Sequence, residues 1–218
     1  ENDNTKMKKK KKKKKKKKTK EKVQATAEDS VCLWDACFDG QLDEVRSLLD
    51  LDGIDIHYSN KNGYTFLYVA SLNGHIDVVK VLIKAGCIVN QADDDGRTPL
   101  YAASSDGNVD IVNVLIDAGG NVNQATTDDG HSPLFIAVQL NHQDIVQQLL
   151  STPNININQS INVDNCVNDN CASPLIIGTY LGNYESVQHL LQHSAIDTTL
   201  TFENKTALQY AQPNERAS

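Results

Sequence analysis

The chain has 218 residues and a net charge of −7 at pH 7. This length allows one sizeable core or a linear array of small units, and it is too short for an elaborate multidomain enzyme. Hydrophobic residues make up 39% of the chain, and no apolar run approaches the ~18 residues that a membrane span requires. We therefore expect a soluble protein.

The charge is distributed very unevenly along the chain. Residues 1–22 hold 14 Lys against three acidic residues, a net charge of +11, so residues 23–218 carry −18. Eleven consecutive lysines, Lys8 to Lys18, repel one another, and we predict that residues 1–27 form a disordered basic arm. Without interleaved aromatic residues, any binding of this arm to nucleic acid is expected to be electrostatic and salt-dependent.

Three interpretations of the basic arm stay open. It is a nuclear import signal, a nonspecific attachment to nucleic acid or an anionic membrane, or a low-complexity tract without a selected role. The residues that follow, VQATAEDS, lack the apolar region of a secretory signal. The five Cys form no dense framework, which suits a reducing compartment. We expect a cytoplasmic or nuclear protein.

A pattern of about 34 residues recurs along the acidic body. DDGRTPLYAAS at residues 94–104 is followed by DDGHSPLFIAV at residues 128–138. Alignment on the leucine gives six copies at spacings of 34, 33, 34, 41 and 33 residues, at Leu33, Leu67, Leu100, Leu134, Leu175 and Leu208. Repetition at this period predicts a stacked-repeat architecture.

Each copy predicts a pair of short helices. Thr98-Pro99 and Ser132-Pro133 combine a capping side chain with a Pro at the first helical position, where no N–H is lost. The second copy has Thr65-Phe66 instead, for which we predict a modest cost of about half a kcal/mol. A left-handed residue is expected after the first helix, usually Gly, with Asn141 in the fourth copy.

The second helix of each pair carries an apolar stripe, which in the second copy is Val78, Val79, Leu82 and Ile83. One pair of helices is too small to bury its stripe alone, so neighbouring pairs must stack. In the first copy, at the N-terminal end of the array, Cys32 and Cys37 fall on the first helix, where small buried thiols are expected.

This unit of turn, cap, helix, Gly and helix resembles the ankyrin repeat. At Thr98-Pro99-Leu100-Tyr101 the match to that family's signature fails only at its usual His. The resemblance implies an all-α ankyrin-repeat solenoid of helix-turn-helix units joined by β-turn or hairpin loops. We place it at residues 28–211, followed by a tail at 212–218, with repeats at 28–60, 61–93, 94–127, 128–166, 167–200 and a partial 201–211.

The resemblance also implies that turn tips and first helices line a concave surface that grips other proteins. The predicted partner-binding residues at the tips are Lys61, Asn62, Tyr64, Asp94, Asp95, Arg97, Asp128, Asp129, His131 and Asp169, and those on the helices are Tyr68, Leu72, Tyr101, Phe135, Leu140 and Tyr180. Acidic tips beside aromatics predict a protein partner that is basic and has an apolar anchor. The alternative is that Asp occupies the loop tips because it forms good turns, and that the aromatic residues pack between neighbouring repeats.

The spacing of 41 residues marks an insertion at residues 151–172, which is rich in Asn and predicts a longer exposed finger. An inert, tolerated insertion is the alternative. Cys166 and Cys171 lie in this insertion, and His189 and His193 follow it. The intervals between these four residues differ from those of zinc fingers. The repeat register already accounts for both His, and we predict neither a metal nor any other cofactor.

Asn90 and Asn123 resemble the Asn that asparaginyl hydroxylases modify in ankyrin repeats. The usual acidic residue two positions earlier is replaced by Ile88 and Asn121. The alternative role for both Asn is hydrogen bonding within the turn.

No nucleophile–base signature or phosphate-binding Gly loop is present in the sequence, so we do not expect an enzyme. The main hypothesis is a noncatalytic, monomeric protein-interaction module that acts as an adaptor, scaffold or inhibitor. One alternative is a factor that the basic arm directs to nucleic acid or an anionic membrane. Another is the recognition segment of a larger polypeptide.

Overall fold

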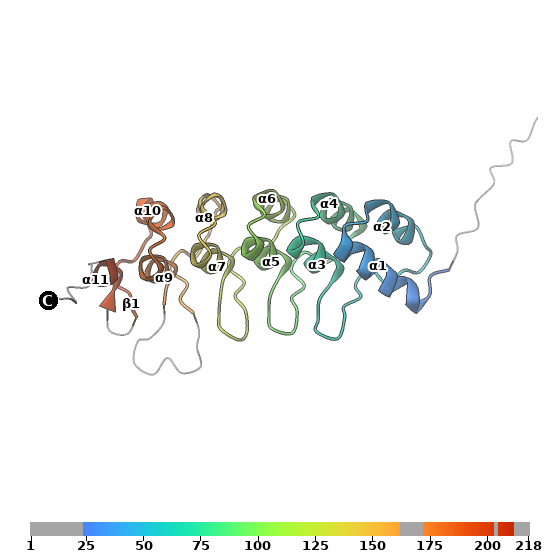
Figure 1. Cartoon of the computed structure of the whole chain (residues 1–218), viewed down its shortest axis with the longest axis horizontal. Coiled ribbons are helices and arrows are strands. Elements are labelled where there is room, and N and C mark those ends of the chain that lie inside the picture. The colour runs from blue at the N-terminus through green and yellow to red at the C-terminus, as the bar shows by residue number, and fades with distance from the viewer. Residues whose placement is uncertain (1–23, 162–171, 203–204, 212–218) are drawn as a thin grey trace, which may run out of the picture.

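The computed structural model describes residues 24–161, 172–202 and 205–211. It consists of helix pairs stacked side by side along one line (Figure 1). The helices are α1 (Ala27–Asp39), α2 (Leu42–Leu49), α3 (Phe66–Leu72), α4 (Ile76–Ala85), α5 (Pro99–Asp106), α6 (Val109–Asp117), α7 (Pro133–Gln139), α8 (Gln143–Leu150), α9 (Pro174–Leu181), α10 (Tyr184–Gln192) and α11 (Ala207–Ala211). The predicted all-α ankyrin-type solenoid is confirmed.

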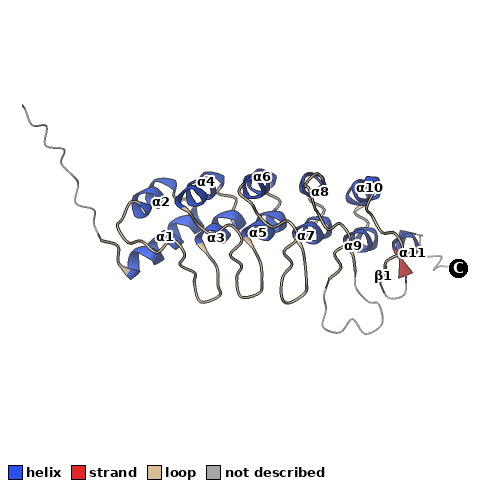
Figure 2. Ribbon diagram, turned by 180° about the vertical axis from the view of Figure 1, so that it is seen from behind, coloured by secondary structure: helices blue, strands red, loops and turns tan. Residues whose placement is uncertain are grey.

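The helices form two rows, which both views show (Figures 1 and 2). The first helix of each pair lies in an inner row (α1, α3, α5, α7, α9 and α11), and the second lies in an outer row (α2, α4, α6, α8 and α10). The aligned leucines of the first five copies are at most 1% exposed, and they form part of one continuous hydrophobic core. Stacking of neighbouring repeats therefore buries the apolar stripe that a single helix pair would leave exposed to solvent.

The predicted caps of the inner helices are present. The side chain of Thr98 accepts from the backbone N–H of Tyr101 at 3.1 Å, and Pro99 takes the first helical position. Thr65, Ser132 and Ser173 cap α3, α7 and α9 in the same way. Each cap satisfies one of the N–H groups that the first turn of a helix leaves without a partner.

Left-handed residues end the inner helices, as the sequence indicates. Gly107 has a φ of 86°, and Asn141 takes the same region with a φ of 60°. Asn is the residue that adopts this conformation best after Gly, so the one substitution in the series keeps the turn.

Asparagines in the loops that follow the outer helices α4 and α6 form a ladder of hydrogen bonds between successive repeats. The amide nitrogen of Asn123 donates to the carbonyl oxygen of Asn154 at 2.8 Å, and its oxygen accepts from the N–H of Asn156 at 2.8 Å. Asn90 makes the equivalent pair of bonds to Gly119 and Asn121. Hydrogen bonding of the turn, the alternative role expected for Asn90 and Asn123, is therefore what the structure shows.

The N-terminal repeat differs from its prediction in two ways. α1 begins at Ala27 and is capped by Thr26, whose side chain exchanges hydrogen bonds with Asp29 in a capping box. The fold extends back to Gln24, which forms a bridge with Asp52, so the boundary placed after residue 27 is too late. Cys37 is buried as predicted, but Cys32 is exposed because no repeat precedes α1 among the described residues to cover it.

The C-terminal end of the array carries a short hairpin before its last helix. β1 (Thr201–Phe202) pairs antiparallel with β2 (Lys205–Thr206), and α11 follows directly. This is the hairpin loop that the repeat pattern predicts in front of an inner helix.

Candidate protein-interaction face

Loop residues and inner-helix residues together form a surface that we call the recognition face. It consists of Tyr64, Arg97 and His131 on the loops, and of Trp34, Tyr68, Tyr101 and Phe135 on the inner helices. The loops and the inner helices lie on the side of the array away from the outer row (Figure 1).

Backbone hydrogen bonds fix the spacing of the loops. The N–H of Asp94 donates to the carbonyl oxygen of Asn62 at 3.3 Å, and the N–H of Thr127 donates to that of Asp95 at 2.8 Å. The helix caps also fix the face, because the N–H groups that they hold belong to Tyr68, Tyr101 and Phe135. The same hydrogen bonds that start each helix therefore position each aromatic residue.

Two aromatic pairs join the loops to the inner helices. The rings of Tyr64 and Tyr68 stack with centroids 4.8 Å apart and planes 9° apart. Those of His131 and Phe135 stack with centroids 4.5 Å apart and planes 11° apart. In both pairs the loop residue covers the helix residue four positions later.

This stacking corrects the prediction at two positions. Tyr68 is 4% exposed and Phe135 is 2% exposed, so neither side chain is open to a partner. The half-buried Tyr64 and His131 are the more exposed members of the two stacked pairs. The alternative expected for the aromatics, that they fill the stack, is correct for Tyr68 and Phe135.

Arg97 lies between the two aromatic pairs and forms ion pairs with two acidic residues. Its guanidinium forms ion pairs with Asp95 at 3.0 Å and with Asp128, in the next loop, at 3.3 Å. The buried carboxylate of Asp93 accepts from the backbone N–H groups of Arg97 and Asp95 at 2.7 and 3.0 Å. Two of the predicted acidic contacts are therefore already neutralised, whereas Asp94 and Asp129 are exposed and have no ion pair among the described residues.

Burial sets the protonation of the aromatic residues. It raises the pKa of Tyr68 to about 12, with Asp93 and Tyr64 acting in the same direction. Burial also raises the pKa of Tyr101, and it lowers the pKa of His131 despite the opposing effect of Asp129 and Asp128. Both Tyr hydroxyls are therefore neutral near pH 7, a state in which they act as hydrogen-bond donors and acceptors and not as nucleophiles.

The exposure of the other predicted partner-binding residues varies. Lys61 and Asn62 are exposed at the first loop tip, and Leu72 is half-buried. Leu140 is 45% exposed and Tyr180 is 60% exposed, at the ends of α7 and α9. Asp169 lies outside the residues that the structure describes.

Trp34, a residue of the recognition face, and its neighbour Phe38 were absent from the prediction. Trp34 stacks on Phe38 with ring centroids 5.6 Å apart, and its indole N–H donates to the carbonyl oxygen of Tyr64 at 3.3 Å. Phe38 is 46% exposed. The repeat register could have identified Trp34, because it follows Leu33 as Tyr68 follows Leu67.

The described residues offer no other chemical site of these kinds. They contain no group of three or more His, Cys, Asp or Glu that is placed to hold a metal ion, and Cys166 and Cys171 lie outside them. No helix in the described part of the chain has the length and apolar character needed to cross a membrane.

Comparison with known families agrees with this geometry. The family model of ankyrin repeats (3 copies) matches residues 13–93, 33–126 and 85–161, which together cover more than half of the chain. The chain belongs to the ankyrin-repeat family. Ankyrin repeats are general protein-interaction modules and are typically noncatalytic.

Two curated relatives are similar to this ankyrin-repeat chain over short stretches. Alpha-latrocrustotoxin-Lt1a of Latrodectus tredecimguttatus is 47% identical over 58 residues, which are 27% of this chain and 4% of the toxin. Cortactin-binding protein 2 of Plecturocebus moloch is 40% identical over 58 residues, again 27% of this chain and 4% of the relative. A match over 4% of a relative shows similarity in the repeat. It does not transfer the activity of the whole relative to this chain.

Proposed function

We propose that this protein is a noncatalytic adaptor, scaffold or inhibitor that binds a protein partner through the recognition face. The observation that carries the proposal is the pair of aromatic stacks, Tyr64 on Tyr68 and His131 on Phe135, on either side of Arg97. Interfaces take most of their binding energy from aromatic and Arg side chains near the centre. Because backbone and cap hydrogen bonds hold these groups in place, little side-chain entropy is lost on binding.

The proposed partner is a basic segment with an apolar anchor. Asp94 and Asp129 are exposed at neighbouring loop tips and meet its positive charge, while Asp95 and Asp128 stay with Arg97. Charge complementarity of this kind speeds the encounter, and burial of the anchor against Tyr64, Trp34 and Phe38 slows dissociation.

The test is affinity capture from cell extract with the full chain and three variants. The face variant combines Tyr64→Ala and Asp129→Ala. The matched control combines Tyr184→Ala and Asp144→Ala, which removes the same two residue types from exposed positions on the outer helices α10 and α8. In the arm variant, Lys8 to Lys18 are replaced by Ser.

We expect discrete partners that survive moderate salt, that the face variant loses, and that the control and arm variants retain. Far-UV circular dichroism verifies that each variant folds. Loss of every partner with the lysines, or in moderate salt, would assign function to the basic arm and overturn the proposal. Equal capture by the face variant and its control would also overturn it.

A further inference from the structure

The basic arm and the rest of the chain carry large charges of opposite sign. Residues 1–22 have a net charge of +11, and residues 23–218 have −18. From residue 98 to residue 204 the sequence has eleven acidic residues and no Lys or Arg. Opposite charges of this size within one chain attract each other strongly at low ionic strength. Residues 1–23 lie outside the residues that the structure describes.

Four carboxylates lie together on two neighbouring loops of the recognition face. We call them the acidic tips: Asp94, Asp95, Asp128 and Asp129. A backbone hydrogen bond of 2.8 Å from Thr127 to Asp95 joins the two loops. The guanidinium of Arg97 pairs with Asp95 and Asp128, so these five side chains have a net charge of −3. Asp94 and Asp129 are exposed and form no ion pair within the described ranges.

A buried carboxylate in the first of these loops has an oxygen without a donor. Asp93 is 7% exposed, and its Oδ1 atom accepts from the backbone N–H groups of Asp95 and Arg97. Its Oδ2 atom is buried and has no hydrogen-bond partner in the part of the chain that the structure describes. A buried acceptor without a donor is costly. The ligand chemistry that this loop lacks is therefore that of a cationic N–H donor.

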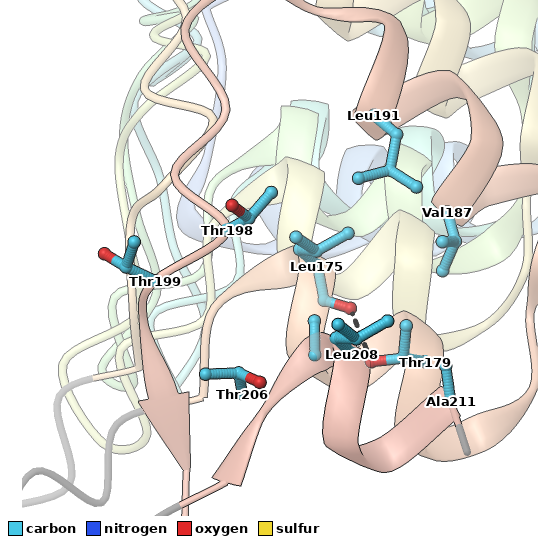
Figure 3. Close-up of a pocket in the computed structure, with 10 residues that line it drawn as sticks. Leu175, Thr179, Val187, Leu191, Thr198, Thr199, Thr206, Leu208 and Ala211 are labelled. Carbon is cyan, nitrogen blue, oxygen red and sulfur yellow. Dashed lines mark hydrogen bonds between the residues drawn. The ribbon is translucent and has the colours of Figure 1, made fainter. Parts of the chain in front are cut away.

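Other surfaces fit a lysine segment less well. Asp77, Asp110, Asp144 and Glu185 lie in the first turns of α4, α6, α8 and α10. The positive end of the helix dipole partly compensates a negative charge at that position, whereas the acidic tips lie in loops and lack this compensation. The pocket of about 560 Å³ between α9, α10 and α11 is lined by apolar side chains and threonines and contains no acidic residue (Figure 3).

The lysines can reach the acidic tips. Gln24 forms a bridge with Asp52, and α1 starts on the side of the array on which the loops lie (Figure 1). An extended chain spans about 3.3 Å per residue, so Lys18 and Lys8 can lie up to about 20 Å and about 53 Å from Gln24. The inner helices α5 and α7, which follow the two loops, are two and three helix spacings from α1, about 16–30 Å.

We propose that the basic arm docks on the acidic tips of its own chain and competes with a partner for the recognition face. This inference rests on the proposed function, because the competition is for the same face. A tethered segment has an effective concentration on the order of 1 mM, so a dissociation constant of about 100 µM for the free segment leaves the tips occupied in about nine of ten molecules. The arm has no aromatic residue, so a partner with an apolar anchor displaces it.

The first test compares backbone amide NMR signals of the full chain with those of the arm variant. Measurements are made at about 0.05 M and about 0.5 M NaCl, on either side of the concentration at which the Debye length is about 10 Å. At low salt the signals of residues 94–97 and 128–130 should differ between the two proteins, and those of Asp110 and Asp144 should coincide. At high salt the difference should disappear.

The second test measures competition by fluorescence anisotropy with a labelled peptide of residues 8–18, eleven lysines. The peptide should bind the arm variant about tenfold more tightly than the full chain. In the arm variant, Asp94→Asn with Asp129→Asn should weaken peptide binding about tenfold. The matched control is Asp35→Asn with Asp39→Asn, which removes the same charge from exposed positions on α1 and should leave the affinity unchanged.

Identical amide signals in the full chain and the arm variant at low salt would overturn the proposal. Equal peptide affinity for the two proteins would also overturn it, as would a control variant that loses as much affinity as the tip variant. Signal differences that grow with protein concentration would place the arm on a second copy, against the proposal. The proposed function fails separately, if Tyr64→Ala with Asp129→Ala in the arm variant leaves the captured partners unchanged.

Discussion

The ring of His131 lies on the ring of Phe135, with centroids 4.5 Å apart and planes 11° apart. His131 comes from a loop and Phe135 from α7, so this contact connects a loop to an inner helix. Burial in this stack lowers the pKa of His131 from its ordinary value of 6.5, and Asp129 and Asp128 oppose the shift. The fold therefore favours the neutral imidazole.

The lowered pKa of His131 predicts a pH-dependent stability. Above the unfolded-state pKa of about 6.5 the contribution is complete, and it is lost as the pH falls from there toward the lower folded-state pKa, because the unfolded chain binds the proton more readily. We expect the free energy of unfolding to fall as the pH drops below about 6.5, and to fall less in His131→Phe, as urea titrations would show. An NMR titration midpoint for His131 above 6.5 would contradict this.

Removal of an asparagine from the ladder should weaken the junction between repeats. Asn123→Ala deletes two hydrogen bonds to the backbone of the next repeat, and we expect a loss of about 1–3 kcal/mol in the free energy of unfolding. Asn123→Asp keeps the acceptor and loses the donor, so its loss should be smaller. Chemical denaturation followed by circular dichroism measures both, and equal stability of wild type and Asn123→Ala would refute the role of the ladder.

Two left-handed glycines separate backbone strain from steric clash. A Cβ at Gly119 meets nothing within 4 Å, whereas a Cβ at Gly96 comes within 2.7 Å of the backbone nitrogen of Thr127. Both have positive φ, so Gly119→Ala should cost about 1–2 kcal/mol from strain alone. Gly96→Ala should cost at least about 1 kcal/mol more, because the loops must also separate. Equal unfolding midpoints would show that the loops are not stacked as described.

The position of Phe66 predicts an unfavourable outcome for a substitution that the repeat pattern favours. Phe66 is 1% exposed and stacks on Tyr58 with ring centroids 5.8 Å apart. Phe66→Pro should gain about half a kcal/mol from preorganisation of the helix start and lose about 3 kcal/mol of core packing. We expect a lower thermal midpoint by scanning calorimetry, with Phe66→Leu intermediate; a stabilised Phe66→Pro would mean that the ring contributes little.

The sequence predicted the caps and turns of the array well because those features are local. Thr98 can cap α5 only through an N–H three residues ahead, and Asn141 replaces Gly because of its own backbone preference. The period of the leucines likewise determined which residues lie between the two rows. At the N-terminus, Thr26 and Asp29 form the capping box of α1 in place of the usual Thr-Pro pair, and this signal too is local.

The residues of the proposed recognition face could be located only in part from the sequence. Register alone places Tyr68 and Phe135 on the inner helices, but it does not show that Tyr64 and His131 cover them. The same holds for Arg97, whose two ion pairs depend on a loop in the neighbouring repeat. Trp34 follows Leu33 in the same register, but its repeat lacks the Thr-Pro pair that marks the start of other inner helices.

The amino-acid sequence by itself determined the repeat, its helix boundaries to within a residue or two, and the surface on which a partner is to be sought. These follow from interactions over three or four residues, which any copy carries within itself. The tertiary structure alone decided which aromatic side chains are buried and which acidic residues are already paired. Exposure is a property of what stacks against a repeat, and stacking joins residues that lie more than thirty positions apart.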